Sequence, residues 1–246
     1  MRILALDSSG LVASVAVVES DRGEAQTIAE YTVNYKKTHS QTLLPMLDEI
    51  AGMIELDLET IDAIAVAGGP GSFTGLRIGS ATAKGLGLAL GKPLVHVPTL
   101  EGLACNLAWT DRLVCPIMDA KRGQVYTGIY AFEEGRLCVL EDQMAIGIDE
   151  LAERLRQYGK GVIFLGDGVP VHRKALVEEL MAGENISFAP ANLNRQRAAS
   201  IAARALTYME EGKTVSAAEH APDYLRVSQA ERERAEREAS NRANKA

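Results

Sequence analysis

Asp7-Ser8-Ser9 is the first place in this 246-residue chain where side chains could do chemistry. The segment follows an apolar run, and its carboxylate and turn N–H groups could hold a phosphate or a hydrated metal ion. The same residues could instead form an Asx turn, in which the carboxylate only accepts a local hydrogen bond. For this segment by itself, the Asx turn is the favoured interpretation.

A glycine-rich segment, 68–77, offers a second place for chemistry. It follows the apolar run 61–67, and its glycines permit a tight turn with positive φ angles. If a helix begins there, the N–H groups of its first turn and the helix dipole would attract an anion. The segment lacks the Gly-Lys-Ser/Thr ending of a P-loop. A turn that only presents a small-faced helix to a partner is an equally good interpretation.

Two later turns carry charge. Asp119, Lys121 and Arg122 stand at the predicted turn of a second hairpin, where charged residues are usually just solvated. Gly166-Asp167-Gly168 follows a short apolar run and could approach a nucleotide. A strand end with positive φ is the commoner cause of such a glycine pair.

Combined, these segments predict at most a nucleotide cleft, with Asp7, Ser8, Gly71 and Gly168 as its cofactor-binding residues. The four histidines are far apart in the sequence, and neither HxxxH nor HExxH occurs. A GxSxG nucleophile elbow is missing as well. We therefore predict no catalytic residues and no metal ligands.

Hydrophobic periodicity predicts the elements that position these turns. The predicted strands are 2–6, 11–18, 25–33, 61–67, 94–97, 113–118, 124–132, 137–140 and 162–165. The predicted helices are 42–54, 73–90, 100–109, 149–158 and 196–211. The first helix is placed to begin at Thr42, so that Pro45 falls in its tolerant first turn. The order hairpin, helix, strand, glycine turn, helix begins again near residue 113, which predicts two similar α/β lobes joined near 105–112.

The predicted helix 73–90 has a face with almost no side chains. Gly75, Gly79, Ala83 and Gly87 recur at every fourth residue, and residues at this spacing share one helix face. Glycine costs a helix interior about 0.5–1 kcal/mol relative to alanine, so three glycines on one stripe suggest a purpose. We predict that another backbone comes very close to this stripe, for packing or for binding.

Composition and charge limit the classes of function. The chain is 47% hydrophobic but only 5% aromatic, which predicts an aliphatic, alanine-rich core. Its net charge of −7 would not attract a polyphosphate backbone, so a partner would supply most contacts to any nucleic acid. Three widely spaced cysteines favour a reducing compartment. No run approaches the roughly 18 apolar residues of a membrane helix, and we expect a soluble, cytoplasmic protein.

Six segments together resemble the TsaB (YeaZ) family. The most specific is Gly-Pro-Gly-Ser-Phe-Thr-Gly-Leu-Arg-Ile-Gly at 69–79. The others are 3–9, 39–45, 97–100, 118–126 and 222–226. The resemblance covers about residues 1–226. It implies the two-lobed fold of the actin, Hsp70 and sugar-kinase superfamily, with duplicated ribonuclease H-like lobes.

The domain organisation implied by the resemblance has three parts. The N-terminal lobe is 1–108, the C-terminal lobe is 109–226, and a charged tail occupies 227–246. The last predicted helix, 196–211, could pack back on the N-terminal lobe.

The resemblance also implies a function. TsaB is the non-catalytic dimerisation subunit of the complex that transfers threonylcarbamoyl to the adenosine 3′ of the anticodon, in tRNAs that read codons beginning with A. Its implied partners are a TsaD-type catalytic paralogue and a TsaE-type P-loop ATPase, with a homodimer when alone and tRNA contacted mainly through the complex. The implied protein is not an enzyme and needs no cofactor of its own, although a nucleotide could bind in the assembled complex.

The implied partner surface lies on the helices 42–54 and 73–90. Its predicted residues are Leu44, Met46, Leu47, Gly75, Gly79, Ala83 and Gly87. The alternative function is a free-standing nucleotide-binding ATPase or kinase of the same superfamily. Against it, Asp7-Ser8-Ser9 lacks the glycine between acid and hydroxyl that is usual in active members. A peptidase is the remotest hypothesis, because neither metal nor nucleophile motifs occur.

Overall fold

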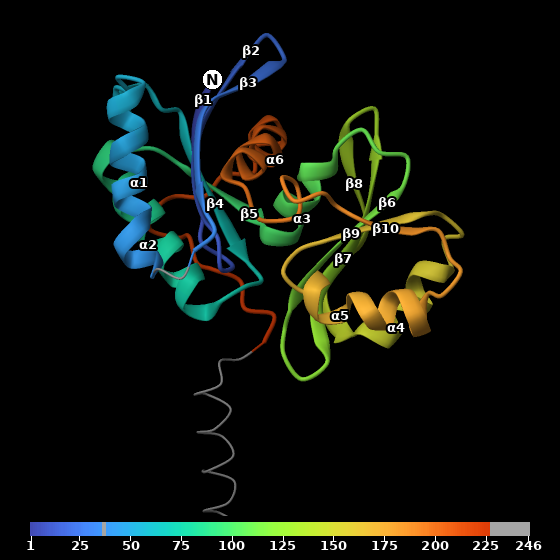
Figure 1. The fold of residues 1–246 in the computed structure, drawn as a ribbon. Helices are drawn as coiled ribbons and strands as arrows, with labels where there is room; N and C mark the ends of the chain where they lie inside the picture. The colour runs from blue at the N-terminus through green and yellow to red at the C-terminus, as the bar shows by residue number, and fades with distance from the viewer. Residues whose placement is uncertain (36–37, 227–246) are drawn as a thin grey trace, which may run out of the picture.

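A computed structural model describes residues 1–35 and 38–226 of the chain (Figure 1). The predicted charged tail, 227–246, lies outside these residues. The first half contains β1 (Arg2–Asp7), β2 (Ala13–Asp21), β3 (Glu24–Val33), α1 (His39–Met53), η1 (Leu58–Thr60), β4 (Ala63–Gly69), α2 (Phe73–Leu90), β5 (Leu94–Pro98), α3 (Thr99–Ala104) and η2 (Cys105–Leu107). The second half contains β6 (Leu113–Asp119), β7 (Gln124–Glu133), β8 (Arg136–Gly147), α4 (Ile148–Arg156), β9 (Val162–Leu165), α5 (Val169–Ala175), the π-helical turn η3 (Leu176–Leu180), β10 (Ile186–Phe188) and α6 (Ala198–Glu210).

The two halves have the same topology. The first sheet has the order β3-β2-β1-β4-β5, and the second, read from its other edge, has the equivalent order β8-β7-β6-β9-β10. In each sheet the first three strands are antiparallel, and the next strand pairs in parallel with the first. The predicted duplicated α/β fold is confirmed.

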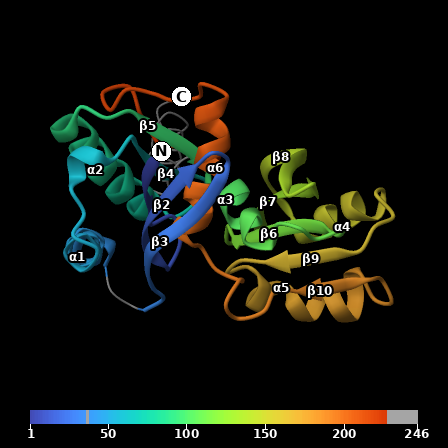
Figure 2. The same ribbon diagram turned by 90° about the horizontal axis from the view of Figure 1, so that it is seen from above.

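The alternation of β1 explains why its sheet is covered on both faces. Leu4 and Leu6 pack with α1 and α2 in one hydrophobic cluster, and Ile3 and Ala5 pack with α6 in another. Figure 2 shows α6 on the opposite side of this sheet from α1 and α2. The chain therefore returns to the first lobe with α6, after the strands of the second lobe.

Helix α1 begins earlier than predicted. It starts at His39 and not at Thr42, so Pro45 lies inside the helix and not in its first turn. Both Pro45 and Gln41 are exposed. The Gln41 carbonyl, which loses its helical partner, thus lies on the side that faces water, and this reduces the cost of the proline.

Helix α5 and strand β10 were not predicted, nor were the short turns η1 and η3, and one strand is longer than predicted. Helix α5 and the three-residue strand β10 are too short for a periodic pattern to show. Strand β8 continues to Gly147, beyond the predicted end at residue 140, as an edge strand with many partly exposed residues.

Candidate functional site: the cleft between the lobes

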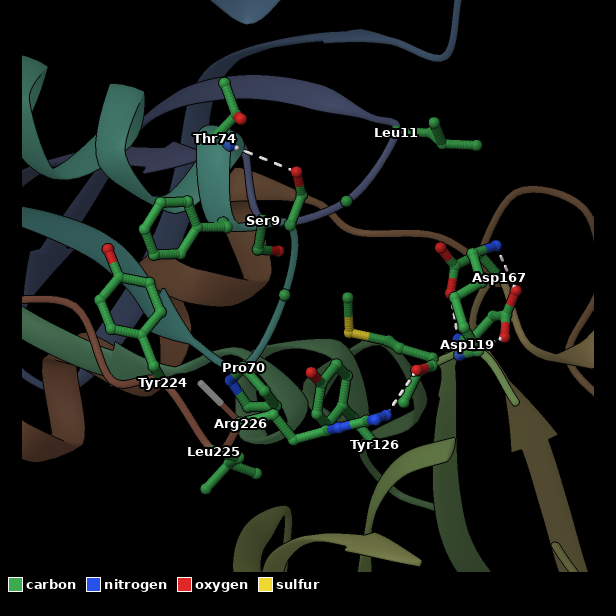
Figure 3. Close-up of a pocket in the computed structure, with 18 of the residues that line it drawn as sticks. Ser9, Leu11, Pro70, Thr74, Asp119, Tyr126, Asp167, Tyr224, Leu225 and Arg226 are labelled. Carbon is green, nitrogen blue, oxygen red and sulfur yellow. Dashed lines mark hydrogen bonds and ion pairs between the residues drawn. The ribbon is translucent and has the colours of Figure 1, made fainter. Parts of the chain in front are cut away.

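A cleft of about 800 Å³ lies between the two lobes, and most of the predicted turns meet there (Figure 3). The first lobe contributes the β1–β2 turn and the start of α2. The second lobe contributes the β6–β7 turn, and the C-terminal segment completes the wall. The lining includes Ser9, Leu11, Pro70, Gly71, Ser72, Phe73, Thr74, Met118, Asp119, Lys121, Tyr126, Asp167, Val171, Tyr224, Leu225 and Arg226.

Asp7 does not line this cleft. Its side chain is 1% exposed, and Oδ1 accepts hydrogen bonds from the Ser9 backbone N–H at 2.8 Å and from the Ser9 hydroxyl at 2.6 Å. Burial raises the pKa of Asp7 to about 6, although the bonds from Ser9 act against this rise. The favoured interpretation of an Asx turn is thus confirmed.

Ser8 and Gly168 also lie behind the cleft wall. The Ser8 hydroxyl donates to the Gly75 carbonyl oxygen at 2.9 Å, which ties the hairpin to α2. The Gly168 N–H donates to the Ile117 carbonyl oxygen at 3.0 Å, and a Cβ at Gly168 would lie only 2.9 Å from that oxygen. Of the four predicted cofactor-binding residues, Gly71 alone borders the cleft. The placement of the other three was wrong, because their polar groups serve internal hydrogen bonds. Nucleotide binding itself stays a prediction.

Two carboxylates face each other on the second-lobe side. Asp119 Oδ2 lies 2.6 Å from the Lys121 ammonium. Burial by itself would raise the pKa of Asp119, but the contacts with Lys121 outweigh it, and the pKa is lowered. Asp167 Oδ1 accepts from the Asp119 N–H at 3.1 Å, and burial raises the pKa of Asp167. The second-lobe side of the cleft thus holds one carboxylate that ionises readily, at the end of β6, beside one that resists ionisation, between β9 and α5.

The small-residue stripe of α2 faces the protein's own first sheet and not a partner. A Cβ on Gly75 would overlap the Ser8 carbonyl oxygen, and a Cβ on Gly87 would overlap Leu94. Gly79 packs on the Ser8 side chain in the same way. Ala83 is fully buried in the hydrophobic cluster that Leu4 and Leu6 form with α1 and α2, here called the first core. The prediction that a partner covers this stripe was wrong: the glycines let α2 lie directly on the β1–β2 turn, β4 and β5.

The predicted contacts on α1 need the same correction. Met46 and Leu47 are 4% and 6% exposed and belong to the first core, whereas Leu44 is 54% exposed. The outward face of the two helices is a different set. It includes Gln41, Leu44, Asp48, Arg77, Ala81, Gly85 and Leu88, of which only Leu44 was predicted.

The C-terminal segment was missed as part of the site. Asp223, Tyr224, Leu225 and Arg226 all line the cleft. The sequence marked these residues only through the resemblance of the segment 222–226 to the TsaB family. Sequence periodicity could not place them, because they lie outside any helix or strand.

Two histidines that are distant in the sequence come together. The rings of His96 and His220 lie 5.4 Å apart between centroids, and burial lowers the pKa of His220 to about 4. Within 1–35 and 38–226, no group of three or more His, Cys, Asp or Glu side chains is arranged to hold a metal ion. Nor does any helix among these residues have the length and apolar character needed to span a membrane.

The duplicated topology and the interlobe cleft define the class of protein: a two-lobed α/β protein with equivalent sheets in its two lobes. The same arrangement occurs in the solved structure of YeaZ from Pseudomonas aeruginosa. That structure superposes with a TM-score of 0.76 at 26% identity, covering 91% of this chain and 99% of that one.

Sequence comparison gives the family. The family model described as "TsaD: tRNA N6-adenosine threonylcarbamoyltransferase" matches residues 26–234. The tRNA threonylcarbamoyladenosine biosynthesis protein TsaB of Bacillus subtilis is 36% identical over 94% of this chain and 96% of its own length. A tRNA N6-adenosine threonylcarbamoyltransferase of Chelativorans is 35% identical, over 48% of this chain and 37% of that protein. The chain belongs to the TsaB family of tRNA threonylcarbamoyladenosine biosynthesis.

Proposed function

We propose that this protein is a non-catalytic subunit that binds and activates a TsaD-type catalytic paralogue in threonylcarbamoyl transfer to tRNA. One observation carries the proposal: the polar groups of the first hairpin turn are used inside the protein. Asp7 is covered and bonded to Ser9, and Ser8 is bonded to Gly75. A turn so occupied supports the fold and offers little to a substrate.

The partner class follows from shared ancestry. Nearly half of this chain is similar to a threonylcarbamoyltransferase, which makes the two proteins relatives over that part. Related lobes can pair through equivalent faces, as identical subunits do in a two-fold dimer. The same face would serve a homodimer when the paralogue is absent.

The proposed contact surface is the outward face of α1 and α2. Leu44 and Leu88 are 54% and 66% exposed there. On α2, Ala81 and Gly85 are also exposed, and a Cβ on Gly85 would meet nothing within 4 Å. Large exposed apolar side chains beside a nearly flat strip of helix suit close packing against a second helix pair.

Leu88→Glu tests this surface. In light scattering after size exclusion, the unmodified chain is expected to form a stable complex with a TsaD-type protein, and Leu88→Glu is expected to abolish it. Val139→Glu is the matched control, since Val139 is an exposed apolar residue on β8 of the other lobe. If Leu88→Glu binds as tightly as the control does, the surface is placed wrongly. If the unmodified chain does not bind, the proposed function fails.

The remaining partners extend the same proposal. A TsaE-type P-loop ATPase would join the assembled pair. Because the chain carries a net charge of −7, tRNA would be held mainly by the other subunits. We place the complex in the cytoplasm, and we assign this chain no cofactor outside the complex.

A nucleotide-binding ATPase or kinase is the second candidate, and the Asp119–Asp167 pair favours it. Carboxylates with opposite pKa shifts in one cleft are a common arrangement in enzymes. Isothermal titration with magnesium ATP tests it. Binding that is lost in Asp119→Asn would support this candidate, and the lack of any heat of binding would remove it.

A further inference from the structure

The segment 220–226 joins the first lobe at the C-terminal end of β4. The Asp223 N–H donates to the Gly68 carbonyl oxygen at 2.7 Å. Gly69 must lack a side chain, because a Cβ there would overlap the Asp223 carbonyl oxygen. The Asp223 carboxylate also lies 3.2 Å from Nε2 of His96. The backbone of the segment is thus seated closely on the first lobe.

An aromatic stack continues this attachment onto α2. The Tyr224 ring lies 4.9 Å from the ring of Phe73, the first residue of α2. The Arg77 guanidinium covers Phe73 at 4.3 Å from its centroid. Such stacks add to the energy of simple burial, so the segment is tied to the start of this helix as well as to the end of β4.

The next two residues carry the chain to the second lobe. Arg226 donates from Nη1 to the Ala120 carbonyl oxygen at 2.7 Å, in the turn between β6 and β7. A bond from a guanidinium is stronger than one between neutral groups. Figure 3 shows Tyr224 and Leu225 on the Pro70 side of the cleft, with the Arg226 side chain extending from there toward Tyr126.

The lobes are also joined near the two crossovers, where the chain passes from the first lobe to the second between η2 and β6 and returns between β10 and α6. Asn106 donates to the carbonyl oxygens of Leu193 and Arg195 at 2.9 and 2.7 Å. Helix α3 packs on the second sheet through Leu100 and Leu103. A joint at one place leaves the angle between two lobes free to change, whereas a second connection across the cleft restricts it.

We propose that the segment 220–226 is a strap that closes the cleft and fixes the angle between the lobes. Asp223 and Tyr224 hold it to the first lobe, and Arg226 holds it to the second. Release of Arg226 lets the lobes move apart about the crossovers. Because the strap is stacked on α2, it also couples the start of that helix to the second lobe. None of this depends on the proposed function.

Electron-spin distance measurements on the full chain test the strap. Nitroxides attached after Gln41→Cys and Lys174→Cys report the distance between the lobes, because both sites are exposed, one on α1 and one on α5. Cys105→Ser and Cys138→Ser remove the two partly exposed native thiols. An excess of unlabelled chain suppresses the signal from pairs of nitroxides on different molecules.

The unmodified strap is expected to give one narrow distance distribution. Arg226→Ala and Tyr224→Ala are expected to add a population at longer distance. Arg22→Ala, which changes an exposed arginine on the distant β2–β3 turn, is expected to leave the distribution unchanged. If folded Arg226→Ala keeps the narrow distribution, the proposal is overturned.

Hydrogen exchange provides a test that needs no variant. The Asp223 amide, which donates to Gly68, is expected to exchange at least ten-fold more slowly than an unstructured amide. Exchange at the unstructured rate would also overturn the proposal.

Discussion

Replacement of glycine by alanine is expected to have opposite effects on stability at two positions of α2. Gly75 and Gly85 both lie inside α2. A Cβ on Gly75 would overlap the Ser8 carbonyl oxygen, a backbone atom of a buried strand end that cannot rotate away. A Cβ on Gly85 would meet nothing within 4 Å. Gly75→Ala is therefore expected to destabilise the protein and Gly85→Ala to stabilise it.

The magnitudes follow from the contacts. Overpacking at Gly75 costs about 1–3 kcal/mol, and displacement of α2 also breaks the Ser8–Gly75 hydrogen bond, which is worth about 1 kcal/mol. Alanine returns about 1 kcal/mol of helix propensity at either position. The net expectation is a loss of about 1–3 kcal/mol for Gly75→Ala and a gain of about 0.5–1 kcal/mol for Gly85→Ala.

Urea unfolding followed by circular dichroism measures both variants, at one low protein concentration so that self-association does not contribute. The midpoint for Gly75→Ala is expected below that of the unmodified chain, and the midpoint for Gly85→Ala above it. Equal midpoints for the two variants would refute the conclusion that the stripe packs on the protein's own first lobe.

The remaining predictions concern two buried carboxylates. Asp7 has a pKa of about 6 in the folded protein against 3.8 in its ordinary state, so its ionisation above pH 6 destabilises the fold by about 3 kcal/mol. Asp7→Asn keeps the acceptor for Ser9, and is expected to be the more stable protein at pH 8 and to lose this advantage near pH 4. Glu101 accepts from Arg204 at 2.6 Å and from Tyr208 at 2.8 Å. Glu101→Ala leaves Arg204 buried without its partner, and is expected to cost about 3–5 kcal/mol in urea unfolding.

Matched controls separate these effects from general damage. Asp48→Asn changes an exposed carboxylate on α1, and should show no gain at pH 8. A stability difference between Asp7→Asn and the unmodified chain that does not change with pH would contradict the buried ionisation. Glu49→Ala, at an exposed site, should cost less than about 0.5 kcal/mol. A Glu101→Ala loss of the same size would contradict the buried pair.

The duplicated fold was predictable because its strands are apolar runs and its helices are periodic. The alternation of Ile3, Leu4, Ala5 and Leu6, each buried on one face or the other, is local information. So was the position of α2, since Ser72 and the glycines mark its start. The turns of both hairpins therefore fell where the spacing predicted, and they meet at one cleft.

The sequence could not show which face of α2 is buried. Four-residue spacing places Gly75 and Gly79 on one face, but α2 also has small residues, Ala81 and Gly85, on its other face. Only packing decides which face is covered. The spacing likewise could not show that Asp7 is sealed by Ser9.

The strap shows a second limit. Arg226 meets Ala120, which is 106 residues away in the sequence, and Tyr224 meets Phe73 across a still longer separation. No local pattern encodes such contacts, because the segment has neither helical nor strand periodicity.

Reconstituted modification of tRNA tests the central claim most directly. A TsaD-type protein, a TsaE-type ATPase, threonylcarbamoyl adenylate and a tRNA that reads codons beginning with A are mixed with and without this chain. Threonylcarbamoyl transfer is expected only when the chain is present, and is expected to persist in Asp7→Asn but to fail in Leu88→Glu. Equal transfer with and without the chain would contradict the account.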